Sequence, residues 1–155
     1  MSALLSLEQV SKTFTRGGLL SRRTIEAVKG VSFALEADKP EIFAVIGESG
    51  SGKSTLARMI LGMHKPSAGK LLFEGRDVAT LTPAEKPAFM ARVQPIFQNP
   101  FEAFNPLKQL DFYLFMTARR FGGATSQAEA ESAAYAALRQ VGLSLGEIKG
   151  RFPHE

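Results

Sequence analysis

Nine residues about a third of the way along the chain, GESGSGKST, have the types and spacing that bind phosphate. They fit the pattern of a glycine, four residues, and then Gly-Lys-Ser/Thr. Glycines let the backbone curl until successive N–H groups point inward, and a helix starting at the end of the stretch adds its own N–H groups and the positive end of its dipole. We expect Lys53 to reach the β- and γ-phosphates of a nucleotide, Ser54 to bind Mg²⁺ and Thr55 to reach the α-phosphate. The predicted nucleotide-binding residues of this stretch are Gly47, Glu48, Ser49, Gly50, Ser51, Gly52, Lys53, Ser54 and Thr55.

The segments on either side have the patterns that such a loop requires. EIFAVIG, residues 41–47, is a short apolar run that predicts a buried parallel strand, and residues 51–61 switch to helical spacing and end at Gly62. A glycine-rich turn that only ends a strand would need neither the lysine nor the two hydroxyls, so the strand–loop–helix order favours phosphate binding. VQPIF, residues 93–97, predicts a second buried strand.

The remaining parts divide into a strand-rich start and a helical end. LLSLEQVSKTF and TIEAVKGVSFAL alternate in polarity and predict two strands, and the basic TRGGLLSRR between them predicts a solvated hairpin tip. SAGKLLFEGRDV predicts a turn, a strand and a second turn, and residues 83–92 a short helix.

Beyond Gln98 the irregular NPFEAFNPL gives way to two helical segments. DFYLFMTARRF is ended by Gly122-Gly123, and SQAEAESAAYAALRQVG has Ser126 and Glu129 in capping-box spacing with Gly142 as its stop.

Composition narrows the possible functions. The chain has 155 residues, a formal net charge of +4 with interleaved signs, no cysteine and two histidines. The mild charge does not argue for nucleic acid, and the absence of cysteine excludes disulfides and thiol catalysis. No apolar run approaches the roughly 18 residues that span a bilayer, and the start lacks the basic region of a signal peptide, so we expect a cytosolic protein.

Four stretches of the sequence resemble the ATP-binding subunits of ABC transporters, in particular the branch that serves oligopeptide, dipeptide and nickel importers. They are VSKTF, GESGSGKSTLARMILG, KPSAGKLLFEGRDV and PIFQNPFEAFNP. The resemblance implies that Phe14 stacks on adenine, although an aromatic residue of the core would fit the same strand position. It also implies that Gln98 contacts Mg²⁺ and the attacking water and lies near the contact with the membrane subunits.

The fold implied by this resemblance is the α/β P-loop NTPase of ABC ATPase type. It would comprise an antiparallel β subdomain at residues 1–41, a phosphate-loop core with an incomplete parallel sheet at 42–98, and the glutamine loop with most of the helical subdomain at 99–155. The chain departs from the family pattern at Pro40, Asn99, Ala103-Phe104 and Leu107. None of these departures touches the phosphate loop, whereas those near Gln98 bear on the substrate branch.

The last residues, RFPHE, match the segment that in this family precedes the signature Leu-Ser-Gly-Gly-Gln, which the 155 residues do not contain. We therefore expect a domain truncated just before its signature motif, with the magnesium-binding aspartate, the catalytic glutamate and the switch histidine outside it, and inactive alone. The expected function of the complete protein is ATP hydrolysis coupled to solute uptake, at the inner face of the cell membrane. Expected partners are permease subunits at the glutamine loop and a second ATPase subunit, and no nucleic acid. Alternatives are a nucleotide-binding module without catalysis and a soluble ABC-type ATPase not linked to transport; a small-molecule kinase would need an arginine-rich lid, which the sequence lacks.

Overall fold

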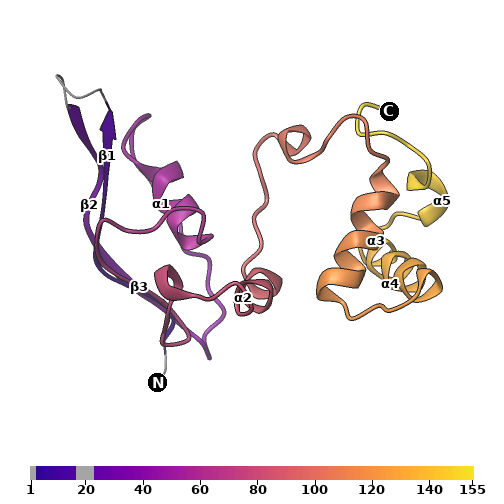
Figure 1. The fold of residues 1–155 in the computed structure, drawn as a ribbon, viewed down its shortest axis with the longest axis horizontal. Helices are drawn as coiled ribbons and strands as arrows, with labels where there is room; N and C mark the ends of the chain where they lie inside the picture. The colour runs from indigo at the N-terminus through magenta and orange to yellow at the C-terminus, as the bar shows by residue number, and fades with distance from the viewer. Residues whose placement is uncertain (1–2, 17–22) are drawn as a thin grey trace. The chain divides into compact units, whose positions relative to one another are not determined.

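The computed structural model describes residues 3–16 and 23–155, which form two compact units, Met1–Lys86 and Pro87–Glu155 (Figure 1). The boundary falls at the first residue of helix α2 (Lys86–Arg92). Of the predicted hairpin tip, residues 15–23, residues 17–22 lie outside the described residues, and residues 15, 16 and 23 are the ends of the two flanking strands.

The first unit is built on a four-stranded antiparallel sheet. Its strands are β1 (Ala3–Arg16), β2 (Arg23–Glu36), β3 (Ala68–Phe73) and β4 (Arg76–Asp77), in the order β2-β1-β3-β4. Alternating apolar positions put one face of the sheet into the core, as period-two patterns do. The two long strands predicted from the sequence are confirmed.

A bulge bends β1 in its middle. The register with β2 shifts between Leu7 and Val10, and Gln9 takes a φ of 49° while its backbone N–H donates to the Ser32 hydroxyl at 2.9 Å. Opposite the bulge, Gly69 has a φ of 80°, and a Cβ there would lie 2.2 Å from the Gln9 carbonyl oxygen. Only glycine therefore lets β3 pass this close to the bulged strand.

Helix α1 (Lys53–Ile60) contributes to the core of this unit (Figure 1). Burying a large aliphatic side chain in such a core stabilises the fold by about 1.5–3 kcal/mol relative to leaving that side chain in water. The buried side chains from the sheet, α1 and the short 3₁₀ turn η1 (Val78–Thr80) are Leu5, Leu7, Val10, Val28, Leu56, Met59, Leu71 and Val78.

The two predicted buried strands are not strands. Residues 41–47 and 93–97 have irregular backbone, Ile42 and Ile96 are fully exposed, and Ile46 is 90% exposed. A parallel strand exists only through the hydrogen bonds of its neighbours, and no described strand pairs with either segment. The parallel part of the predicted core sheet is therefore not formed within the described residues. Residues 41–47 still contact the antiparallel sheet through Phe43, whose ring stacks on that of Phe33 in β2 with 4.5 Å between the ring centroids.

The second unit is helical, as the sequence predicts. It contains η2 (Pro100–Ala103), α3 (Leu110–Phe121), α4 (Gln127–Gln140) and α5 (Leu145–Ile148). Helices α3 and α4 pack side by side (Figure 1), and the buried residues between elements are mostly small, which permits close approach. These residues are Ala118, Ala130, Ala134 and Leu138.

The predicted ends of α4 are confirmed. The Ser126 hydroxyl accepts the Glu129 N–H at 3.2 Å while the Glu129 carboxylate accepts the Ser126 N–H at 3.2 Å, which is a complete capping box. Gly142, with a φ of 76°, follows the last turn.

Candidate functional site

The phosphate-loop residues form a turn that runs directly into α1. The Ser51 N–H donates to the Glu48 carbonyl at 3.2 Å, and Gly52 is the N-cap of the helix, which starts at Lys53. No side chain caps this end, and its first turn holds no acidic residue. The N–H groups and the positive dipole end at the start of α1 are thus left for an external anion.

Gly52 fixes where this helix end lies against the sheet. Its φ is 91°, and a Cβ at this position would lie 2.0 Å from the carbonyl oxygen of Ala27 in β2. Backbone-to-backbone contact of this kind excludes every residue that carries a side chain. Gly52, the glycine that precedes the lysine in the phosphate-loop pattern, is therefore needed both for its left-handed conformation and for its close approach to β2.

The amine of Lys53 is directed back over the loop. Its Nζ donates to the Gly47 carbonyl at 2.7 Å and to the Glu48 carbonyl at 2.6 Å, and lies 3.5 Å from the Ser51 hydroxyl. These partners are neutral oxygens, so the hydrogen bonds orient the amine without neutralising its charge. A phosphate entering the loop would meet an oriented cation that is free to exchange weak acceptors for charged ones.

The hydroxyls that follow the lysine lie on the first turn of α1. Ser54 is exposed and Thr55 is half-buried. An accessible hydroxyl oxygen is a hard ligand of the type that Mg²⁺ accepts beside phosphate oxygens, so the donor set fits a Mg²⁺–nucleotide. The other predicted loop residues, Gly47, Glu48, Ser49, Gly50 and Ser51, are all exposed.

An open cavity of about 700 Å³ adjoins the loop. Its volume lies in the range of small-molecule sites. Sequence motifs did not point to the β2 residues that form one wall, because no local pattern marks which strand lies beside a loop. The lining residues are Glu26, Ala27, Val28, Lys29, Val31 and Phe33 of β2, then Phe43, Ala44, Val45, Ile46, Gly47, Gly50, Ser51, Lys53 and Leu56.

Phe14 lies near the end of β1 and is 37% exposed, so it is not part of the buried core. It does not line the cavity, but it is close to the loop along the sheet. It pairs across to Ile25, and its neighbour Thr13 pairs to Glu26, which precedes the Ala27 that touches Gly52. Its ring meets His64 edge-on at 5.7 Å.

Gln98 belongs to the second unit, whereas the phosphate loop belongs to the first. It is exposed, in the irregular segment between α2 and η2. On the far side of η2, the Asn105 N–H donates to the hydroxyl of Tyr113 in α3 at 2.6 Å, and the Phe104 ring packs edge-on against Tyr113. The predicted irregular segment is thus anchored to α3 by an aromatic residue that the sequence had not singled out.

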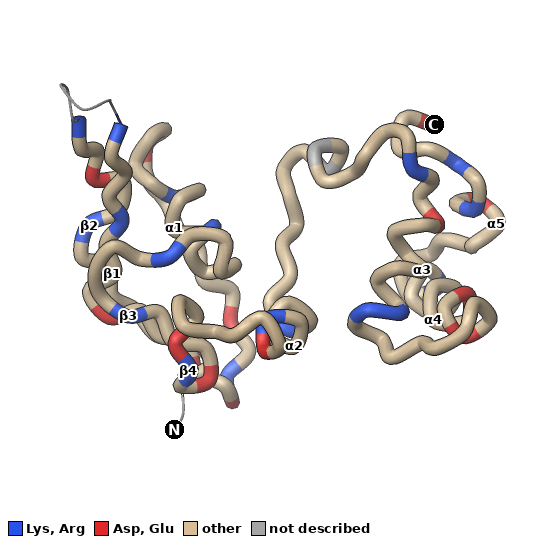
Figure 2. The backbone as a smooth tube through the Cα atoms, in the orientation of Figure 1, with Lys and Arg blue, Asp and Glu red and all other residues tan. Residues whose placement is uncertain are grey.

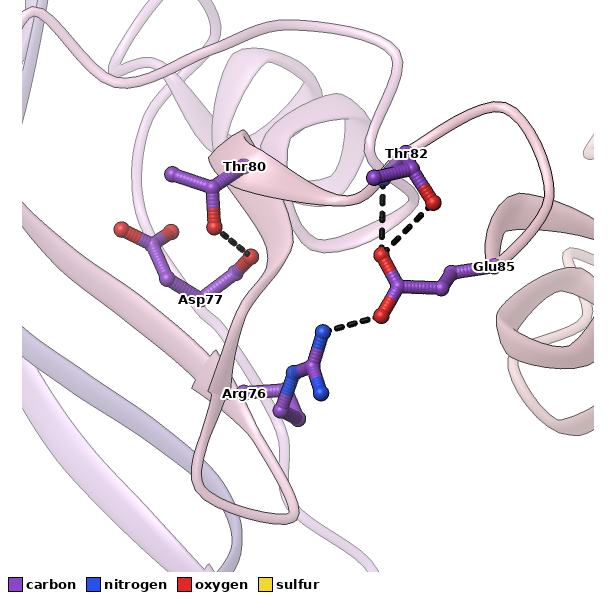
Figure 3. Close-up of polar contacts among 5 residues, drawn as sticks. All are labelled: Arg76, Asp77, Thr80, Thr82 and Glu85. Carbon is purple, nitrogen blue, oxygen red and sulfur yellow. Dashed lines mark hydrogen bonds and ion pairs between the residues drawn. The ribbon is translucent and has the colours of Figure 1, made fainter.

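A polar cluster orders the connection between β4 and α2 (Figure 3). The Glu85 carboxylate accepts the Thr82 N–H at 2.9 Å and the Thr82 hydroxyl at 2.8 Å, and it pairs with Arg76. The Thr82 N–H, then its hydroxyl and the Arg76 guanidinium, hold the pKa of Glu85 below its ordinary value. These contacts hold the turn that leads into α2, and we assign the cluster a structural role.

Two further findings concern the whole of the described chain. Figure 2 shows basic and acidic residues interspersed in both units. Among residues 3–16 and 23–155, no helix has the length and apolar content to cross a membrane, and no three histidine, aspartate or glutamate side chains gather as metal ligands.

Comparison with known proteins points in one direction. The family model described as ABC transporter matches residues 28–152. The chain is 35% identical to the oligopeptide transport ATP-binding protein AppF of Bacillus subtilis, over 98% of this chain and 46% of that protein. It is 34% identical to the nickel import ATP-binding protein NikE of Pseudomonas putida, over 99% of this chain and 55% of that protein. The chain thus spans about half the length of the curated relatives it matches.

Solved structures agree on the fold. The ATP-binding cassette MJ0796 bound to ADP and Pi superposes with a TM-score of 0.73 at 24% identity, covering 97% of this chain and 62% of that one. The cbiO1 subunit from Clostridium perfringens superposes with a TM-score of 0.69 at 20% identity, covering 99% and 55%. The predicted class, an α/β fold of ABC ATPase type with an antiparallel β subdomain, is confirmed.

Proposed function

Since the chain belongs to the ABC transporter family, we propose that it is the ATP-binding portion of an importer ATPase that couples ATP hydrolysis to uptake of peptides or similar small solutes. The observation that carries the proposal is the uncapped start of α1 with the Lys53 amine held over the loop. The names of the relatives, oligopeptide transport and nickel import, support the substrate class.

The proposal gives distinct roles to the phosphate loop, to Phe14 and to Gln98. The N–H groups of the loop and the Lys53 amine bind the β- and γ-phosphates, and Ser54 supplies the hydroxyl ligand for Mg²⁺. Bound Mg²⁺ neutralises charge that develops on the phosphates. Phe14 receives the adenine by stacking, and Gln98 orients the water and touches the metal.

The partners follow from the same assignment. We propose that transmembrane permease subunits contact the segment around Gln98 and that a second ATPase subunit completes the hydrolytic site. The protein would then work on the cytoplasmic side of the membrane, as a peripheral subunit.

A second candidate is a nucleotide-binding module without catalysis. It is favoured by one observation, which concerns the segment that leads into the phosphate loop, residues 41–47, and the segment directly before Gln98, residues 93–97. Neither segment is held in a sheet in the described chain. In this case residues 1–155 by themselves would bind Mg·ATP without hydrolysing it.

The experiment that tests the proposal is calorimetric titration of Lys53→Ala with Mg·ATP. Loss of a charge-assisted hydrogen bond worth about 1.5–3 kcal/mol should weaken binding roughly 10- to 150-fold. Arg58→Ala is the matched control, because it removes one exposed cation from the opposite end of the same helix. Equal affinities of Lys53→Ala and the unaltered chain would refute the phosphate-loop assignment.

A further inference from the structure

The ring of Phe14 is held by two residues that no motif of the phosphate loop includes. The Lys12 Nζ lies 5.2 Å from the centroid of the Phe14 ring, and the His64 ring meets it at 5.7 Å with an interplanar angle of 79°. We propose that Lys12 and His64 are positioning residues, which fix this ring in the orientation that receives the base of the nucleotide. The inference rests on the proposed function, since it presumes that a base stacks on Phe14.

The ammonium group of Lys12 has a hydrogen-bond partner of its own. Its Nζ donates to the carbonyl oxygen of Lys65 at 2.7 Å, and the residue is half-buried. A lysine held in this way keeps its charge within the roughly 6 Å at which an ammonium is attracted to an aromatic face. Because the hydrogen bond to Lys65 holds the Lys12 ammonium in place, the attraction between the ammonium and the Phe14 ring restrains the position of the ring.

The segment that carries His64 and Lys65 is tied down at both ends. On one side the Met63 N–H donates to the Arg58 carbonyl of α1 at 2.8 Å. On the other side the Ser67 N–H donates to the Ser11 carbonyl at 2.8 Å, and the Thr13 N–H donates to the Ser67 hydroxyl at 3.1 Å. The contacts to β1 thus lie on either side of Lys12 and next to Phe14.

This arrangement links the two ends of the nucleotide. The start of α1 carries the phosphate loop, and the residues after its last turn hold the ring proposed for the base. Phosphate and base would therefore be bound by parts of one hydrogen-bonded frame, and the ring would be in place before the nucleotide arrives. Such pre-organisation saves the entropy of ordering a side chain on binding.

A purely structural role makes a different prediction. Neither Lys12 nor His64 belongs to the buried core of the first unit. Their removal should change the affinity for the base while leaving the affinity for a bare triphosphate unchanged. A residue that only supports the fold would affect both ligands alike.

The test is calorimetric titration of the full 155-residue chain with Mg·ATP and with Mg·tripolyphosphate. Lys12→Met, which keeps an unbranched apolar stem, should weaken ATP binding about 2- to 5-fold, and Lys12→Arg should restore it. His64→Leu should weaken ATP binding about 2- to 13-fold. Neither variant should lose more than Phe14→Ala, because the contacts act only through that ring.

Lys65→Met is the matched control. It removes the same charge from the same segment but keeps the carbonyl oxygen to which Lys12 donates, so its ratio of ATP to tripolyphosphate affinity should equal that of the unaltered chain. If Phe14→Ala changes this ratio while Lys12→Met and His64→Leu do not, the inference fails and the base site stands. If Phe14→Ala leaves the ratio unchanged, both the base site and the inference fail.

Discussion

Replacing Gly52 with alanine should disrupt the candidate phosphate site more than any other glycine substitution in the loop. The new Cβ would lie 2.0 Å from the Ala27 carbonyl oxygen and 3.1 Å from its carbonyl carbon. Both atoms belong to the backbone of β2, where Ala27 lies between Val28 and Glu26, which pair with Lys12 and Thr13 of β1, so a displacement of Ala27 would disturb these two pairs. The helix start would have to shift instead.

The free-energy cost of Gly52→Ala has two parts, backbone strain and steric overlap, and Gly50→Ala serves as the control that separates them. Gly50 has a φ of 84°, close to the 91° of Gly52, but a Cβ there has no neighbour within 4 Å. Gly50→Ala should therefore cost only the left-handed strain of an L-residue, about 1–2 kcal/mol. Gly52→Ala adds the overlap, which in a packed site typically costs about 1–3 kcal/mol more.

Hydrogen exchange measured peptide by peptide is the suitable assay. Both tyrosines, Tyr113 and Tyr135, lie in the second unit and the chain has no tryptophan, so spectroscopic unfolding would report mainly on the wrong unit. Protection of β2 and α1 peptides should fall further in Gly52→Ala than in Gly50→Ala by a factor of about 5 to 150. Equal protection in the two variants would refute the claim that the contact with Ala27 fixes the helix start.

Two further predictions concern turnover and pH. Residues 1–155 by themselves should release phosphate no faster than their Lys53→Ala variant. The reason is that hydrolysis also needs an oriented water and groups that the family resemblance assigns outside these residues. Turnover clearly above that of the Lys53→Ala variant would contradict the prediction. The pKa of Glu129 lies below its ordinary value of 4.5, first because its carboxylate accepts the Thr125 N–H, then because it accepts the Thr125 hydroxyl and the Ser126 N–H. Because its pKa is lower in the folded state, the ionised Glu129 carboxylate stabilises the fold fully above pH 4.5. This stabilisation is lost as the pH falls through the pKa that Glu129 has in the folded state. The protection of α4 amides, taken relative to intrinsic exchange at the same pH, should therefore fall on acidification below about pH 4.5. The same loss of protection in Glu129→Gln would show that another group is responsible.

Local features of the sequence determined much of this protein. The spacing of glycines, lysine and hydroxyls in residues 47–55 predicted both the loop and the helix that follows it, because the φ angles and N–H groups involved are set within a few residues. The capping box of Ser126 and Glu129 and the stop at Gly142 were predictable for the same reason. Alternation likewise located the two long strands, since the side-chain period of a strand is a local property.

Tertiary structure decided what depends on partners far along the chain. The apolar runs at 41–47 and 93–97 have the composition of buried strands, yet a strand also needs a neighbour to receive its hydrogen bonds, and composition does not supply one. The approach of Gly52 to Ala27 and the contact of the Phe14 ring with His64 join residues from different elements. No local pattern encodes these contacts, because they arise only when the sheet and α1 pack around a common core.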